Sequence, residues 1–304
     1  MGELIEWVDL LVQQGWRMTS YHTLSRSSAA KFSIIIPSWN NLKFLELCID
    51  SITKNSEFEH QVIVHVNEGN DGTADWLKDR KIDHTCSEIN VGICYGVNTA
   101  VSLAATDYLL YMNDDMYACP AWDKYLWEEI ETIGHDNFFL SSTMIERTGT
   151  GNDCVLAPFD FGDGPENFNE EKLLRELDTL QFDDWNGATW PPNVVHRKLW
   201  ELVGGLSVEF SPGMYSDPDF SMKLWRAGVR IFKGIGKSKV YHFQSRSIGR
   251  VRKNDGRRLF LNKWGVSSSF FCNKVLLRGK PFTGPLQDAD LNPGVRDRLK
   301  KLFS

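Results

Sequence analysis

Short apolar runs alternate along this chain with segments in which apolar residues recur every three or four positions. The run Lys31 to Pro37 is rich in β-branched residues and stops at a proline, which predicts a buried strand. A helix is expected from the N-cap Asn41 to about Lys54, because apolar residues between them share one face. Gln61 to Val66 repeats the strand pattern. This alternation predicts an α/β fold with a mostly parallel sheet flanked by helices.

The same patterns continue through the second half of the chain. Helices are expected at about 73–78, 93–105, 120–133, 170–180, 196–203 and 216–227. Strands are expected at 138–145 and 240–243, and the stretch 185–193 reads as a loop or an edge strand.

The centre of this pattern is an apolar strand, Tyr108 to Met112, that runs directly into Asn113, Asp114 and Asp115. In α/β sheets, side chains at the carboxyl end of a strand lie where ligands bind. Two adjacent carboxylates repel each other unless a cation or a donor-rich ligand lies between them. Taken alone, the residues fit equally well an acidic turn that caps the next helix.

Composition narrows the function classes. The 304 residues are 42% hydrophobic and carry a net charge of -6, which suits a globular protein and argues against a general nucleic-acid binder. No apolar run approaches the roughly 20 residues that span a bilayer, and the start lacks a signal peptide pattern. The six cysteines show no CxxC pairing. We therefore expect reduced thiols and a cytoplasmic location.

Basic residues concentrate near the end of the chain. The run from Arg246 to Arg258 follows the strand that carries His242, and the stretch Val295 to Phe303 reads as a basic amphipathic helix. Two roles fit the basic run: a lid that closes over a phosphate group, or a peripheral contact with the anionic inner face of a membrane.

Several short motifs occur in a fixed order on this α/β pattern. They are Pro37-Ser38-Trp39-Asn40, Asp71-Gly72-Thr73, Asn90-x-Gly92 with Asn98, Asn113-Asp114-Asp115, Ser216-Asp217-Pro218-Asp219, and His242 with Ser245-Arg246-Ser247. Each motif is weak alone, but the ordered set resembles glycosyltransferase family 2, which has a GT-A fold. The similarity is to inverting members that build bacterial surface polysaccharides.

The resemblance implies a divalent cation, Mn²⁺ or Mg²⁺, that neutralises the leaving diphosphate of a nucleoside diphosphate sugar. It assigns Asp115 as the main metal ligand and places Asn113 and Asp114 beside the ribose and the metal waters. His242 matches the position that supplies a second metal ligand or else touches the diphosphate.

An inverting transfer also needs a general base that takes the proton of the acceptor hydroxyl. By resemblance, Asp217 is that base. Asp219 lies two residues on, so it faces elsewhere on the same helix and is expected to be structural. Both could instead be acids that a helix N-terminus favours.

The donor site is expected to include a larger set of residues. They are Pro37, Ser38, Trp39, Asn40, Asn67, Glu68, Asn90, Gly92, Asn113, Asp114 and Arg246. The chain departs from the family where an aspartate usually reads the base, since it has Val66-Asn67-Glu68 there. Either Asn67 or Glu68 could contact the base or the ribose. UDP- and dTDP-sugars are the favoured donors.

Trp185 and Trp190 are candidates for the acceptor site, because indole rings stack on sugar C–H surfaces. The acceptor would be a hydroxyl of a glycan or a lipid-linked glycan. We expect an N-terminal helical extension at 1–30, a catalytic domain at 31–248 and a basic helical extension at 249–304. The catalytic domain would divide into a nucleotide-binding half, about 31–118, and an acceptor half, about 119–248.

Two other functions compete with a transferase. An inactive nucleotide- or sugar-binding module would keep the fold, but the presence of Asp115, Asp217 and His242 argues against it. A sugar nucleotidyltransferase would carry glycine and a basic residue after the first strand, and Pro37 to Asn41 has neither.

Overall fold

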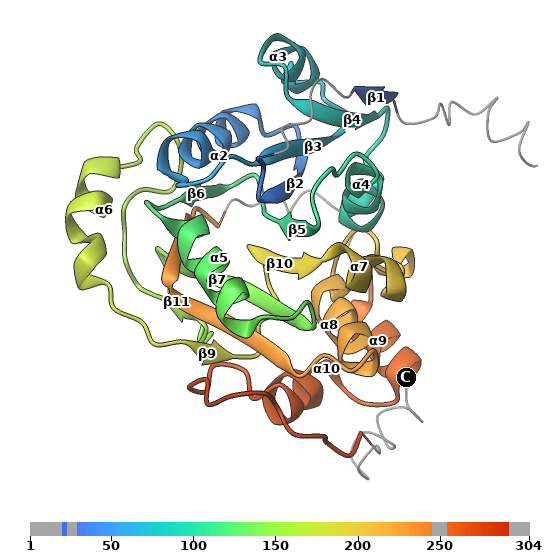
Figure 1. Cartoon of the computed structure of the whole chain (residues 1–304). Coiled ribbons are helices and arrows are strands. Elements are labelled where there is room, and N and C mark those ends of the chain that lie inside the picture. The colour runs from blue at the N-terminus through green and yellow to red at the C-terminus, as the bar shows by residue number, and fades with distance from the viewer. Residues whose placement is uncertain (1–19, 23–28, 245–253, 292–304) are drawn as a thin grey trace, which may run out of the picture.

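The computed structural model describes residues 20–22, 29–244 and 254–291. Most of the expected N-terminal extension, the predicted donor residue Arg246 and the expected helix from Val295 to Phe303 lie outside this part of the chain. No helix within it is long and apolar enough to cross a membrane. Figure 1 shows one twisted sheet with helices on both faces, and it confirms the expected α/β class.

The sheet contains two groups of parallel strands that run in the same direction, with one reversed strand between them. Its order is β1 (Ser20–His22), β4 (Asp83–Ser87), β3 (Gln61–Asn67), β2 (Phe32–Trp39), β5 (Tyr108–Tyr111), β10 (Asn193–His196), β7 (Phe138–Glu146), β11 (Ile231–His242) and β6 (Met116–Ala118). Strands β4, β3, β2 and β5 pair in parallel, as do β7 and β11. Strand β10 runs antiparallel to both β5 and β7 and joins the two groups. Two short strands pair beside this path: β8 (Val155–Leu156) runs parallel to β7, and β9 (Trp185–Asn186) runs antiparallel to β11.

Alternate residues of β2 enter two separate cores, because successive side chains of a strand point to opposite faces. Ile34 and Ile36 pack with α2 (Leu42–Asn55), α3 (Thr73–Asp79) and α5 (Trp122–Ile133). Ile35 packs on the other face, in the core that includes α4 (Gly92–Val101), α7 (Arg197–Val203), α8 (Ser216–Arg226) and α9 (Gly256–Trp264). A third core lies under α6 (Glu170–Glu176) and η1 (Leu177–Thr179).

The chain after the predicted catalytic domain packs into the second of these cores. Phe260 of α9 and Phe271 are fully buried there, close to α8. The remaining elements are short: η2 (Val208–Phe210), α10 (Ser268–Phe270) and the π-helical turn η4 (Phe271–Val275). Figure 1 shows α9 and α10 beside α8, on the side of the sheet away from α2. These C-terminal residues therefore help to hold α8 in place.

Strand β11 is much longer than the predicted strand at 240–243. It starts at Ile231, and lysine and glycine residues interrupt its apolar pattern. Lys233 is nevertheless buried in the sheet, because Glu129 and Asp184 pair with its ammonium group at 2.7 and 2.9 Å. Ion pairs between distant segments cannot be detected in the local pattern of apolar residues. The sequence therefore predicted only the last part of this strand.

One predicted cap is also corrected. The side chain of Asn41 makes no capping hydrogen bond at the start of α2. Asp71 performs this function from the loop after β3, because its Oδ2 accepts the Leu42 N–H at 2.8 Å. The cap therefore ties α2 to that loop, which carries the Asp71-Gly72-Thr73 motif.

Candidate active site

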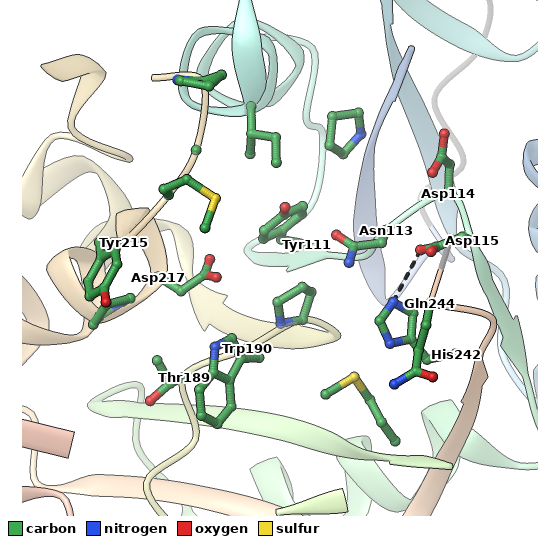
Figure 2. Close-up of a pocket in the computed structure, with 18 of the residues that line it drawn as sticks. Tyr111, Asn113, Asp114, Asp115, Thr189, Trp190, Tyr215, Asp217, His242 and Gln244 are labelled. Atoms are coloured by element: carbon green, nitrogen blue, oxygen red, sulfur yellow. Dashed lines mark ion pairs between the residues drawn. The ribbon is translucent and has the colours of Figure 1, made fainter. Parts of the chain in front are cut away.

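Loops at the carboxyl ends of β2, β3, β5 and β7 surround a pocket of about 760 Å³. Its other walls come from the loop before α8, the end of β11 and the segment that follows α10. Figure 2 shows acidic side chains on opposite sides of it, with Asp114 and Asp115 on one side and Asp217 on the other. The pocket thus brings together residues that lie far apart in the sequence.

Asp115 and His242 meet on one wall of this pocket. Nε2 of His242 lies 3.4 Å from Oδ1 of Asp115 (Figure 2), and Nδ1 lies 2.8 Å from Oε1 of Glu146. Burial alone would lower the pKa of His242, but the two carboxylates raise its pKa to about 10. The imidazole is therefore held in a fixed orientation by a carboxylate on each side. Gln244 adds a second support, since its Nε2 donates to Oε2 of Glu146 at 3.0 Å.

Asn113 and Asp114 lie beside this pair and also line the pocket. Ser38, at the end of β2, donates from Oγ to Oδ2 of Asp114 at 2.7 Å. The motif after β2 is therefore linked directly to the acidic motif after β5. In Figure 2, the Asn113 side chain points toward Tyr111 and the centre of the pocket.

A second group of predicted donor residues lines the end of the pocket formed by β2, β3 and α4. They are Pro37, Trp39, Asn67, Asn90 and Gly92. Oδ1 of Asn67 accepts the Val91 N–H, and Oδ1 of Asn90 accepts the Gly92 N–H, each at 2.9 Å. Both asparagines therefore fix the turn that enters α4.

Asn40 and Glu68 do not line the pocket. Oε2 of Glu68 accepts from Nε1 of Trp39 at 2.9 Å and from Nδ2 of Asn40 at 3.1 Å. Glu68 therefore fixes the Trp39 indole ring, and Asn40 supports the same carboxylate oxygen. Of the two candidates for reading the base or the ribose, Asn67 lines the pocket and Glu68 does not.

Asp217 and Asp219 begin helix α8 but have different surroundings. Asp217 is half-buried in the pocket wall, and among the described residues it makes no hydrogen bond or ion pair. Burial raises the pKa of its carboxyl group from 3.8 to about 7. Asp219 is fully buried, accepts from Nε1 of Trp264 at 2.7 Å and lies 3.0 Å from Nζ of Lys263. Asp219 thus links α8 to α9. Asp217 instead faces the pocket, and its raised pKa suits a group that takes up and releases a proton near neutral pH.

The two predicted acceptor tryptophans also have different positions. Trp190 lines the pocket, and in Figure 2 it lies next to Thr189 below Asp217. Trp185 is only 4% exposed and does not line the pocket. Its Nε1 donates to Oγ1 of Thr143 at 2.9 Å, and its ring covers Gly234 so closely that a Cβ there would lie 1.8 Å from Cε2. The prediction of an acceptor contact is therefore corrected for Trp185, which is a core residue.

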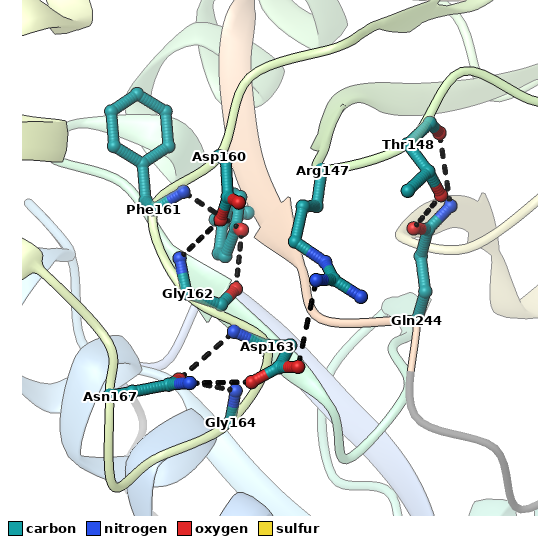
Figure 3. A network of polar contacts seen from close by, with 10 residues as sticks. Arg147, Thr148, Asp160, Phe161, Gly162, Asp163, Gly164, Asn167 and Gln244 are labelled. Carbon is teal, nitrogen blue, oxygen red and sulfur yellow. Dashed lines mark hydrogen bonds and ion pairs between the residues drawn. The ribbon is translucent and has the colours of Figure 1, made fainter.

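Polar contacts brace the loop after β7 and join it to Gln244, as Figure 3 shows. Oγ1 of Thr148 donates to Oε1 of Gln244 at 2.7 Å, and Arg147 lies 3.6 Å from Asp163. Further along, Oδ1 of Asn167 accepts the Asp163 N–H at 3.0 Å, and the Tyr241 hydroxyl donates to the Gly162 carbonyl at 2.6 Å. These contacts attach the loop to the end of β11.

Two charged residues of the pocket, Glu146 and Arg278, were not predicted from the sequence. Glu146 ends the buried strand β7, so the signal that singled out Asp115, an acid directly after an apolar strand, was also present there. Arg278 reaches the pocket from the C-terminal segment, and only the tertiary fold brings it there. Arg246 was predicted to bind the donor and lies outside the described residues.

The residues present fit a divalent cation as a two-residue site. Adjacent ligands of an octahedral ion bonded at about 2.1 Å lie about 3 Å apart, close to the 3.4 Å between Asp115 and His242. The contact between Glu146 and Nδ1 is the arrangement that fixes a metal-binding histidine in many proteins. The described residues contain no cluster of three or more His, Cys, Asp or Glu side chains that could hold a metal. A cation here would need further ligands from a substrate or from water.

Comparison with known proteins shows which family the domain resembles. Residues 33–182 match the model of the family described as Glycosyl transferase family 2. This part, just under half of the chain, is similar to a family 2 glycosyltransferase domain. A Haemophilus influenzae protein described as an uncharacterized glycosyltransferase is 22% identical over 201 residues, which is 63% of this chain and 61% of that protein.

Solved structures place this domain in the GT-A fold class. Residues 1–349 of S. aureus TarS superpose with a TM-score of 0.50 at 20% identity, over 70% of this chain and 60% of that one. GalNAc-T7, crystallised with UDP, GalNAc and Mn²⁺, gives 0.53 at 11% identity, over 76% of this chain and 45% of that one. At these identities the likeness shows the fold. The aligned part covers less than two thirds of each of these relatives.

Proposed function

We propose that this protein is an inverting, metal-dependent glycosyltransferase that moves a sugar from a UDP- or dTDP-sugar to a hydroxyl of a glycan or glycolipid. The observation that carries this proposal is the pairing of two acidic centres across one pocket. Asp115 with His242 suits a diphosphate-bound cation, and Asp217 suits a proton acceptor. The similarity of the domain to family 2 supports the reaction class.

The donor would lie along the wall formed by β2, β3 and β5. Trp39 and Asn67 would contact the nucleobase, and Asn113 and Asp114 the ribose; all four line the pocket. A bound Mn²⁺ or Mg²⁺ would neutralise the charge that develops on the leaving diphosphate. Asp115 and His242 would hold it, with Glu146 fixing the imidazole. TarS has also been crystallised with UDP-GlcNAc, and GalNAc-T7 with UDP and Mn²⁺, which supports a uridine donor and a metal.

The acceptor would enter between Asp217 and Trp190. Ionised Asp217 would take the proton from the acceptor hydroxyl as that oxygen attacks the anomeric carbon from the face opposite the diphosphate. A carboxyl group with a pKa of about 7 is a stronger base than an ordinary aspartate and still ionises near neutral pH. The indole face of Trp190 would contact the apolar face of a sugar ring.

Calorimetry of nucleotide binding tests the donor half of this proposal. UDP, dTDP and GDP are titrated with and without Mn²⁺ into the wild type, Asp115→Ala and Asp75→Ala. Asp75 is an exposed acid outside the pocket, so its replacement is a control with the same change in charge. We expect one nucleotide to bind tightly only with Mn²⁺, and Asp115→Ala alone to remove that dependence while its melting temperature is retained. Mn²⁺-dependent binding that survives in Asp115→Ala would exclude this metal site.

A further inference from the structure

Arg278 is built into the pocket by a set of backbone contacts from the C-terminal segment. The Gly279 N–H donates to the Asn186 carbonyl at 2.9 Å, and the Asn186 N–H donates to the Lys280 carbonyl at 2.8 Å. Gly187 has φ +88, and a Cβ there would lie 2.6 Å from Cα of Arg278. A glycine is therefore required beside Arg278, and the two segments fix the position of its backbone.

The side chain of Arg278 lies over the ring of Trp190, with 4.9 Å between Cζ and the ring centroid. Both residues line the pocket, and within the described part of the chain no acidic side chain forms an ion pair with this guanidinium group. Two other partly buried cations do have acidic partners: Lys263 pairs with Glu209, and Arg230 with Asp288. An arginine that lies over an indole ring in a pocket wall is suited to bind a planar or tetrahedral anion.

The position of this cation is on the Asp217 side of the pocket. Cys272 also lines the pocket and is close enough to both charged groups to be influenced by them. Burial raises the pKa of its thiol to about 11; the charge of Arg278 acts to lower this pKa, and the charge of Asp217 acts to raise it. The raised pKa of Asp217 has burial as its cause, so Arg278 does not hold that carboxylate ionised. The guanidinium group is therefore available to a ligand that also reaches Asp217.

We infer that Arg278 and Trp190 form a subsite for an anionic acceptor, a sugar that carries a phosphate or carboxylate group beside the hydroxyl that is glycosylated. This inference rests on the proposed function for the position of the acceptor. Ser268 and Ser269 line the same wall and offer hydroxyl groups near the anion. Since the other charged residues of the pocket are mostly carboxylates, this arginine determines where a negatively charged acceptor binds.

Ligand-observed NMR with matched probes tests the subsite. N-acetylglucosamine is compared with its 6-phosphate, and glucose with glucuronate, on the wild type, Arg278→Gln, Arg278→Lys and Lys280→Gln. Lys280 is an exposed neighbour outside the pocket and controls for the loss of one positive charge. We expect the wild type and Lys280→Gln to bind the anionic probes about tenfold more tightly than the neutral ones, and Arg278→Gln to lose this preference. Arg278→Lys keeps the charge and loses the planar stacking, so it should retain part of the preference.

The titrations are made both with UDP and Mn²⁺ and without them, and UDP affinity is measured for each variant. Preference for anions that persists in Arg278→Gln, or that is absent from the wild type, would overturn the subsite. Loss of UDP affinity in Arg278→Gln with unchanged probe binding would also overturn it, since Arg278 would then contact the donor. If the wild type binds no nucleotide, the proposed function fails, but the preference measured without nucleotide still decides the role of Arg278.

Discussion

Replacing Asp217 by asparagine should make the protein more stable while it removes turnover. Burial raises the pKa of Asp217 from 3.8 to about 7 in the folded state, whereas the unfolded chain has the ordinary value. Between these two values the unfolded state has lost its proton and the folded state has not, so stability falls as the pH rises. Above pH 7 the folded state bears the full free-energy cost of ionising this buried carboxyl group. Below about pH 4 that cost is absent, because the group is neutral in both states.

The shift of about three units corresponds to roughly 4 kcal/mol at about 1.4 kcal/mol per unit, which is an upper limit. Asp217 is half-buried in a pocket that admits water, so screening reduces the effect to about 1–3 kcal/mol. Asp217→Asn keeps the shape of the side chain and removes the charge. We therefore expect a gain of that size at pH 8 that disappears toward pH 4. UDP affinity should stay unchanged while turnover is lost, because the donor lies on the other wall.

Urea unfolding at a series of pH values measures this difference, and Asp219→Asn is the matched control. Asp219 is on the same helix but is paired with Lys263 and Trp264, so its replacement should destabilise the protein by about 1–3 kcal/mol at neutral pH. Opposite signs for the two variants at pH 8 are the expected result. An Asp217→Asn protein that is no more stable than the wild type at pH 8 would refute the argument that burial raises this pKa.

Two further substitutions examine the supports around the pocket. Glu146→Gln should weaken Mn²⁺-dependent UDP binding by about tenfold in calorimetry, because His242 loses the carboxylate that orients it; unchanged binding would show that Glu146 has no such role. Gly234→Ala should destabilise the protein by about 1–3 kcal/mol or more in urea unfolding, since the new methyl group would overlap the Trp185 ring. A neutral effect would mean that Trp185 can move, contrary to its assignment to the core.

Much of the first half of the fold could be predicted from the sequence. Strand β2 and helix α2 have clean apolar patterns, and an acidic motif after an apolar strand correctly pointed to the edge where Asp115 lies. Local periodicity failed for β10, which is a four-residue strand between β5 and β7 and is defined by its partners. Short strands of this kind depend on tertiary pairing, and no local pattern reveals it.

In the site too, some residues could be predicted from sequence motifs, whereas others depend on tertiary contacts. Asp115, His242 and Asp217 could be selected by motif, and all three line one pocket. The distinction between Trp185 and Trp190 could not be made from the sequence, because it depends on Gly234 lying opposite the Trp185 ring. Arg278 could not be predicted for a similar reason. Backbone pairing between segments that are distant in the chain brings it to the pocket.

A crystal structure of the protein grown with UDP and Mn²⁺, with anomalous data collected at the manganese edge, tests the central claim most directly. The account predicts one strong manganese peak within bonding distance of Asp115 and His242, with diphosphate oxygens among its other ligands and the uracil ring beside Trp39 and Asn67. Asp217 should face the side of the donor site away from the diphosphate. UDP bound with manganese elsewhere, or with neither Asp115 nor His242 as a ligand, would contradict the proposed active site.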